Sequence, residues 1–179
     1  MISYRRMKLS EIERIAEIDR TETVEKAYRQ HGSELELIDV AWDIGHWSTK
    51  EQLSEWDKYL QKGSVLWGAF EGDLLVGFCC YRPDIAPGMG LLALMYVSAA
   101  HRRLGIGCKL TQMLVEHAKE TQISGLYVTA EPTSGTVDFY HNLGFRPTER
   151  PLLELLKLEP DDIHMRMEFP SPGDGTQSA

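Results

Sequence analysis

Residues 95–110 read MYVSAAHRRLGIGCKL, and this stretch decides how the rest of the chain is interpreted. It opens in the apolar run Leu91–Val97, which is typical of a strand buried on both faces. Beyond Gly105 and Gly107, apolar side chains keep helical spacing at Leu110, Met113, Leu114 and Ala118. The stretch therefore predicts a buried strand, a glycine-containing loop and an amphipathic helix in direct succession.

The loop between that strand and that helix has the features of a phosphate site. Its two glycines permit close approach of the backbone, and the N–H groups over 104–108 lie at a helix N-terminus, which carries about half a positive charge. Arg102 and Arg103 add two cations. The residues alone leave a second interpretation open, a plain strand-to-helix turn with solvated arginines.

Two other phosphate-binding loops are excluded by residue identity. A dinucleotide fingerprint needs a third glycine where this chain has Leu110. A P-loop needs Gly-Lys-Ser/Thr, whereas Gly107 is followed by Cys108. A nicotinamide-linked enzyme is accordingly the least favoured interpretation of these glycines.

Toward the N-terminus the sequence pattern indicates a hairpin and two helices. Val65–Phe70 and Leu74–Tyr81 are apolar runs joined by residues typical of a turn, so we expect them to pair as antiparallel strands. Two capping boxes of the Ser-x-x-Glu type predict helices over 10–20 and 48–63. Between these helices, Thr23–Gln30 fits a helix, whereas the alternation over 34–37 fits a half-buried strand.

Toward the C-terminus, strands and helices alternate. Leu126–Ala130 predicts another buried strand, and Thr136–Leu143 predicts a short helix that ends at Gly144. The last two predicted strands are Leu152–Leu158 and Ile163–Phe169. This order predicts one α/β domain with a mixed sheet over residues 1–169. Residues 170–179 have no large apolar side chain, and we expect a disordered tail there.

Composition limits the partners and the compartment. The chain has 179 residues, 42% hydrophobic and 26% charged, which suits one globular domain. A formal charge of -8 argues against nucleic acid and favours a cationic or amine-bearing partner. Neither an N-terminal apolar leader nor an apolar run long enough for a membrane span is visible. The three cysteines, Cys79, Cys80 and Cys108, suit a reduced, cytoplasmic protein without disulfides, and a homodimer is left open.

Two motifs in order resemble the GNAT superfamily of N-acetyltransferases. The first is Arg102-x-x-Gly105-x-Gly107, and the second is Tyr140 followed after three residues by Gly144-Phe145. The resemblance runs from about residue 2 to residue 169 and is strongest over 91–145. It implies a mixed, mostly antiparallel sheet flanked by helices, in which a bulge splays the fourth strand from the fifth. It also implies acetyl-CoA as cosubstrate, with no metal.

The same resemblance implies where the cosubstrate lies. Met95 and Val97 would pair with the pantetheine amides, the loop 102–108 would hold the pyrophosphate, and Tyr140 would donate a proton to the leaving thiolate. The implied cofactor-binding residues are Met95, Tyr96, Val97, Arg102, Arg103, Leu104, Gly105, Ile106, Gly107, Cys108, Thr133, Asp138 and Tyr140. The family often has Asn and a small Ala where this chain has Thr133 and Thr136. A core tyrosine is the alternative for Tyr140.

The general base is less clearly indicated. An ammonium acceptor must lose a proton before it attacks, yet the fourth strand (91–96) contains no acid. Glu131 is the first candidate, with Asp84 and Glu25 behind it, and water or a merely solvated carboxylate are the alternatives. The expected function is acetyl transfer from acetyl-CoA to a primary amine, either of a small molecule or of a protein. The alternative is a catalytically inactive coenzyme A-binding sensor or partner-binding module.

Three other groups of residues are weaker candidates. Asp43 and His46 lack the spacing of a metal motif. Cys108 lies at a helix N-terminus but has no His and acid placed by motif, so a nucleophile is not indicated. Three tryptophans in the N-terminal half either line an acceptor pocket or belong to the core, namely Trp42, Trp47 and Trp56.

Overall fold

A computed structural model describes residues 1–46, 60 and 63–170. A seven-stranded sheet has the order β1-β4-β5-β6-β7-β9-β8, and strands β2 and β3 form a separate hairpin. All neighbouring strands of the large sheet are antiparallel except β6 and β7. The elements are β1 (Ile2–Met7), η1 (Leu9–Glu17), β2 (Glu22–His31), β3 (Glu34–Ile44), β4 (Val65–Glu71), β5 (Leu74–Ala86), β6 (Met89–Val97), η2 (Ala99–His101), α2 (Ile106–Glu120), β7 (Gly125–Ala130), α3 (Ser134–Asn142), β8 (Arg146–Pro147), α4 (Leu153–Leu158) and β9 (Ile163–Glu168). The expected mixed, mostly antiparallel sheet is confirmed.

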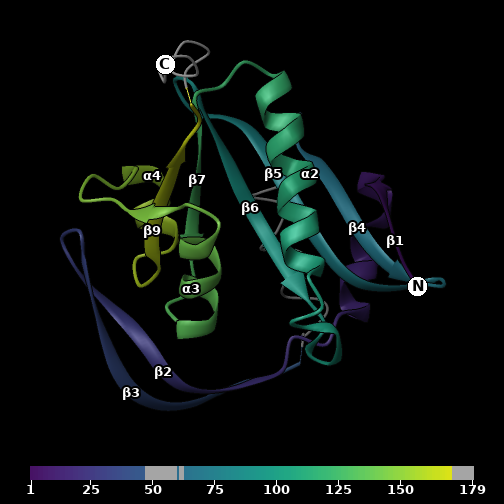
Figure 1. Cartoon of the computed structure of the whole chain (residues 1–179), viewed down its shortest axis with the longest axis horizontal. Helices are drawn as coiled ribbons and strands as arrows, with labels where there is room; N and C mark the ends of the chain where they lie inside the picture. The colour runs from purple at the N-terminus through teal and green to yellow at the C-terminus, as the bar shows by residue number, and fades with distance from the viewer. Residues whose placement is uncertain (47–59, 61–62, 171–179) are drawn as a thin grey trace, which may run out of the picture.

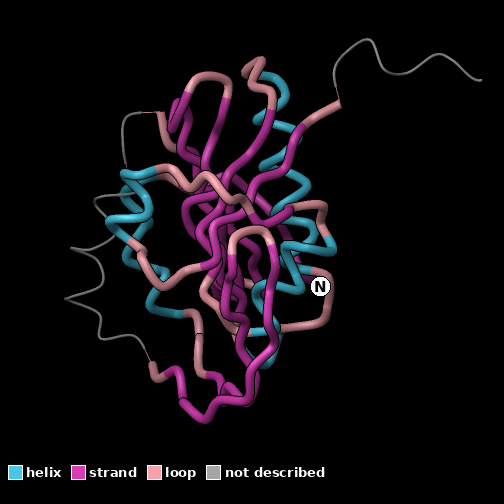
Figure 2. The backbone as a smooth tube through the Cα atoms, turned by 90° about the vertical axis from the view of Figure 1, so that its left-hand side faces the viewer, coloured by secondary structure: helices cyan, strands magenta, loops and turns pink. Residues whose placement is uncertain are grey.

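Helices cover both faces of the sheet, as Figure 2 shows. On one face, Leu110, Leu114 and Ala118 of α2 are fully buried against strands β4 to β7. On the other face, Ile15 of η1 packs in a second cluster. Adjacent Cys79 and Cys80 of β5 belong to opposite clusters, as the alternation of a strand requires, and both are free thiols.

Strand β6 carries a bulge and then parts from β7. Leu92 pairs with Tyr81 of β5 and Leu94 pairs with Cys80, so Ala93 is the extra residue. The parallel pairing of β6 with β7 covers only residues 89–91 of β6. Beyond Leu91 the two strands diverge, which is the splay that the sequence resemblance implied.

The β2–β3 hairpin lies across the end of the sheet at which β6 and β7 stop (Figure 1). It is joined to the loop after β7, because the N–H of Tyr28 donates to the carbonyl of Pro132 at 2.7 Å and Ala27 forms a bridge with Thr133. The hairpin therefore covers the region where the two splayed strands end.

Two predicted elements are wrong. Thr23–Gln30, expected as a helix, belongs to strand β2, because pairing with β3 and docking on Pro132 outweigh the local helix propensity. Leu152–Leu158, expected as a strand, is the short helix α4, which buries Leu155 against the outer face of β6 and β7. Strand β9 lies between β7 and the two-residue strand β8.

The predicted helix boundaries also shift. The first helix is a 3₁₀ segment whose cap lies earlier than expected, because the N–H of Lys8 donates to the carboxylate of Glu11 at 2.9 Å. The predicted helix over 48–63 falls almost entirely outside the described residues, as does the predicted tail after Pro170. Within the described ranges, no helix is long and apolar enough to cross a membrane.

The packing of α2 predicts the effect of truncating one side chain. Leu110 is fully buried, so Leu110→Ala should lower the free energy of unfolding by about 2–5 kcal/mol through lost contacts and a cavity. Leu153 is 72% exposed, and Leu153→Ala should change it by no more than about 0.5 kcal/mol. Urea denaturation of both variants measures this difference. Equal stability of the two variants would contradict the placement of α2.

Candidate active site

The open edge of β6 presents backbone groups at Met95 and Val97. The N–H of Ser98 donates to the carbonyl of Val76 at 2.9 Å, which makes this pair a hydrogen-bonded pair of the antiparallel ladder. Such pairs alternate with pairs whose N–H and C=O groups point outward. Val97 lies opposite Gly77 and Met95 opposite Cys79, so their backbone groups point away from β5 and into the β6–β7 opening.

The loop after β6 presents a row of N–H donors at the start of α2. Gly105 occupies the N-cap position with φ of 79°, a left-handed conformation that favours glycine, and its carbonyl accepts the first helical bond from Lys109 at 3.0 Å. Among the described residues, no acceptor engages the N–H groups of residues 104–108. Leu104 is 66% exposed, so the loop is open to solvent. These donors suit a pyrophosphate.

Gly107 joins this loop to helix α3. A Cβ at Gly107 would lie 3.1 Å from the ring of Phe139 and 3.9 Å from Val97. Glycine at this position lets α2 begin close to α3 without displacing the Phe139 ring. The phosphate loop, the open edge of β6 and the helix that carries Tyr140 are therefore held together.

The side chain of Arg102 is engaged within the protein. Its Nε donates to the carbonyl of Val97 at 3.2 Å, its Nη1 to the carboxylate of Glu22 at 2.7 Å, and its Nη2 to the carbonyl of Arg20 at 3.0 Å. Arg103 is exposed and adopts φ of 62°. Arg102 lies beside the loop, but its partners at 20 and 22 are distant in sequence, and no motif signalled them.

Helix α3 carries Tyr140, is capped by Thr133 and is joined to strand β2 through Asp138. Thr133 accepts from the N–H of Thr136 at 3.2 Å as the helix cap, and Asp138 accepts from the hydroxyl of Tyr28 at 2.9 Å. Tyr140 is 5% exposed, between the rings of Phe139 and Phe145. Burial raises the pKa of Tyr140 well above its ordinary value, so the hydroxyl keeps its proton.

Of the three candidate bases, Glu131 lies at the end of β7 that has parted from β6. It follows β7 directly, and desolvation raises its pKa, while Arg20 and Arg102 act in the opposite direction. Asp84 lies toward the β5–β6 turn, at the end of β6 remote from Val97. Glu25 is exposed at the irregularity in β2. The structure brings Glu131 toward the loop and leaves Asp84 apart.

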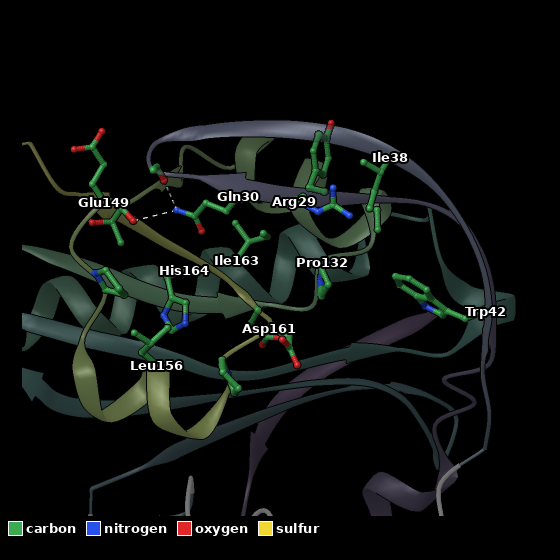
Figure 3. A pocket seen from close by; sticks show the side chains of 17 residues that line it. Arg29, Gln30, Ile38, Trp42, Pro132, Glu149, Leu156, Asp161, Ile163 and His164 are labelled. Carbon is green, nitrogen blue, oxygen red and sulfur yellow. Dashed lines mark hydrogen bonds between the residues drawn. The ribbon is translucent and has the colours of Figure 1, made fainter.

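A cavity of about 520 Å³ lies between the β2–β3 hairpin and the β9–α4 region (Figure 3). Trp42, 40% exposed, lines it from the hairpin side, and three acids line it from other segments, namely Glu149, Asp161 and Asp162. Asp162 also contributes to the raised pKa of Tyr140 and of Tyr96, for which burial is the main cause. Trp42 was a sequence candidate, whereas no pattern singled out the acids. Trp47 and Trp56 lie outside the described residues.

The side chains considered for a metal have other partners. The hydroxyl of Thr23 donates to Asp43 at 2.8 Å, and His46 lies 3.7 Å from the carboxylate of Asp19. His164, in the cavity wall, contacts the hydroxyl of Tyr127 and the carbonyl of Glu159, and burial lowers its pKa. In the described part of the chain, no group of three or more His, Cys, Asp or Glu residues is arranged to hold a metal ion.

Comparisons with known proteins agree with this geometry. The profile of the Acetyltransferase (GNAT) family matches residues 22–145. A Bacillus anthracis protein assigned as a streptothricin acetyltransferase and solved with acetyl coenzyme A superposes with a TM-score of 0.73, at 18% identity, over 95% of this chain and 99% of that one. Nourseothricin acetyltransferase gives 0.72, at 18% identity, over 94% and 99%.

A third structure, the PaiA N-acetyltransferase of Thermoplasma acidophilum with coenzyme A, gives a TM-score of 0.61 at 17% identity over 94% of this chain and 99% of that one. At these identities the likeness establishes the fold. No curated protein matches the sequence. The family profile, however, spans well over half of the chain, and with the splayed strands and the glycine loop it leads to one conclusion: the chain belongs to the acetyltransferase (GNAT) family, whose members transfer an acetyl group from acetyl-CoA to amine-bearing substrates.

Proposed function

We propose that this enzyme transfers the acetyl group of acetyl-CoA directly to a primary amine, without a covalent enzyme intermediate. The observation that carries the proposal is the continuity of donors from the β6 edge to the start of α2. The outward groups of Met95 and the outward N–H of Val97, whose carbonyl accepts from Arg102, suit the pantetheine amides, and the N–H groups over 104–108 suit the pyrophosphate. The residues present therefore fit acetyl-CoA, whose thioester supplies the activated acetyl group.

The proposed chemistry needs one proton acceptor and one proton donor. Glu131, directly or through water, takes a proton from the ammonium, and the free amine then attacks the thioester carbonyl carbon. A C–N bond forms and the C–S bond breaks, with the electron pair going to sulfur. Tyr140 donates its proton to that thiolate, and its phenolate takes back, directly or through water, the second proton that the attacking nitrogen loses as the amide forms. Outward N–H groups of β6 stabilise the charge that develops on the carbonyl oxygen.

The cysteines support direct attack over an acyl-enzyme. Burial raises the pKa of Cys80 to about 12 and that of Cys79 well above its ordinary value, so both stay protonated thiols in the core. Cys108 is exposed at the start of α2, and among the described residues no histidine or acid is bonded to it. A thiol without a neighbouring base is a weak nucleophile.

The acceptor we propose is a small cationic amine that enters through the cavity beneath the hairpin. A volume of about 520 Å³ is in the range of small-molecule sites. The acids of its wall favour an ammonium, in a chain whose net charge is -8. Two of the similar structures are named as streptothricin and nourseothricin acetyltransferases, which supports a small-molecule acceptor.

A catalytically inactive coenzyme A-binding module is the second candidate. It is favoured by one observation, the lack of an acid on β6, whose residues over 91–96 are Leu, Leu, Ala, Leu, Met and Tyr. Such a module requires the phosphate loop but gives Tyr140 no chemical role. The two candidates therefore differ in what a change at Tyr140 does.

The N–H donors over 104–108 predict that a negative charge in this loop weakens the binding of acetyl-CoA. Leu104→Glu puts a carboxylate beside the N–H groups meant for the pyrophosphate, and acetyl-CoA affinity measured by calorimetry should fall at least about tenfold. Leu153→Glu, a similarly exposed leucine on α4, serves as the matched control and should bind normally. Equal affinity of the two variants would remove the loop from the cofactor site.

The position of Tyr140 predicts a loss of turnover without a loss of binding. Tyr140→Phe should lower kcat by about 10²-fold or more, because the leaving thiolate loses its proton donor, while acetyl-CoA affinity stays within about threefold. Because burial raises the pKa of Tyr140, the hydroxyl stays protonated above pH 10, and the wild type should show no alkaline loss of kcat below that pH from this group. Normal kcat in Tyr140→Phe would favour the core-tyrosine interpretation.

The acidic residues that line the cavity predict that removing one of them weakens the binding of a cationic acceptor. Asp161→Asn should raise KM for a diamine about threefold to tenfold and leave KM for acetyl-CoA unchanged, because one attractive charge is removed from the acceptor side only. Asp73→Asn, in the β4–β5 turn, is the matched control. Steady-state kinetics with both substrates varied measures the effect, and an unchanged diamine KM in Asp161→Asn would place the acceptor elsewhere.

A further inference from the structure

The chain segment that leads into the hairpin is fastened to the end of β6. The N–H of Ala99 donates to the carbonyl of Asp19 at 2.8 Å, and the N–H of Asp19 donates to the hydroxyl of Ser98 at 3.1 Å. Ser98 is 6% exposed. These two bonds bring residues 19–22 alongside residues 97–102, although about 80 positions separate them in sequence.

Arg102 completes this junction with a charged contact. Its guanidinium pairs with Glu22, the first residue of β2, at 2.7 Å, and the two side chains are 33% and 31% exposed. The other carboxylate oxygen of Glu22 lies 3.7 Å from where a Cβ would stand on Gly135, in the first turn of α3. The pair therefore sits where the cofactor strand, the hairpin and α3 meet.

The bonding of Arg102 leaves it poorly suited to hold a phosphate. Each of the three guanidinium nitrogens already donates to an oxygen of the protein, namely those of Val97, Arg20 and Glu22. Three of the five N–H donors of the guanidinium are thereby used, and a phosphate bound to the other two would lie as a second anion beside Glu22. The exposed Arg103 and the N–H groups over 104–108 offer a phosphate no such conflict.

The same junction faces the candidate base. Three charged groups act on Glu131: Arg20 and Arg102, which lower its pKa, and Glu22, which raises it. The side chain of Arg20 in turn donates to the carbonyl of Gly45, just after β3, so both ends of the hairpin reach this cluster. A change in the pair of Arg102 and Glu22 would therefore alter both the hairpin and the charge around Glu131.

We infer that Arg102 is a positioning residue rather than a phosphate ligand: paired with Glu22, it fixes the β2–β3 hairpin to the end of β6 and so joins the acceptor side of the site to the cofactor side. The inference rests on the proposed function, because the hairpin matters to catalysis only if the acceptor binds beneath it. It departs from the role that the sequence motif implied for Arg102.

The test compares Arg102→Gln, Glu22→Gln and the double variant in steady-state kinetics with spermidine as the probe acceptor. Each single change should raise KM for spermidine about tenfold and leave acetyl-CoA affinity within about threefold. The double variant should be no worse than either single one, because the two residues act as a unit. Lys119→Gln, in the last turn of α2, is the control for the loss of one positive charge and should leave the spermidine KM and the acetyl-CoA affinity unchanged.

The pH dependence of kcat/KM gives a second measurement, which would not change if Arg102 and Glu22 had only a structural role. Glu22→Gln removes a negative charge near Glu131 and should shift the acidic limb of kcat/KM to lower pH, whereas Arg102→Gln should shift it to higher pH. Arg102→Lys keeps the charge but loses the forked geometry, so it should raise the spermidine KM with little shift of the limb. It also keeps the test usable if Arg102→Gln does not fold.

Two results would overturn the inference. One is a tenfold loss of acetyl-CoA affinity in Arg102→Gln with normal affinity in Glu22→Gln, which identifies a phosphate ligand. The other is an unchanged spermidine KM in both variants. Failure of the proposed function looks different, because the wild type itself would then bind acetyl-CoA poorly or acetylate no amine.

Discussion

The separation of β6 from β7 after Leu91 is the constraint on which the candidate site depends. A parallel neighbour would consume the outward backbone groups of Met95 and Val97, and the bulge at Ala93 coincides with the point at which that neighbour departs. Burying unpaired amides in a core is costly, so an opening lined by them is stable only where solvent or a ligand can pair with them. The extended amide-bearing arm of acetyl-CoA is a partner of that kind.

Charge is divided between the two sides of this opening. The protein carries a net charge of -8, yet its cosubstrate is a polyanion, so the phosphates must be bound by a local arrangement that works against the overall field. Backbone N–H groups at the start of α2 meet that need without a large number of cations, and Arg102 is left to bind Glu22. The surplus of acid then remains available to the amine acceptor, on the side where Glu149, Asp161 and Asp162 line the cavity.

Local patterns predicted the centre of the fold and the glycine-containing loop between β6 and α2, because strand, loop and helix follow one another in sequence there. The helix predicted for Thr23–Gln30 was wrong because this strand is stabilised by pairing with β3 and by contact with Pro132. Neither interaction can be detected in the local sequence. The strand predicted for Leu152–Leu158 was wrong because a leucine-rich run of this length is compatible with either a strand or a helix that buries one face. The partners of Arg102 and the acids of the cavity come together only through the tertiary fold, so no spacing in the sequence could reveal them.

The most direct measurement is the stoichiometry of products when the purified protein is incubated with acetyl-CoA and a panel of monoamines, diamines and peptides. Direct transfer predicts one free coenzyme A thiol for each N-acetylated amine detected by mass spectrometry, with no acetylated protein accumulating and with diamines preferred. Tight binding of acetyl-CoA without any release of thiol across the whole panel would contradict catalysis and identify a coenzyme A-binding module instead.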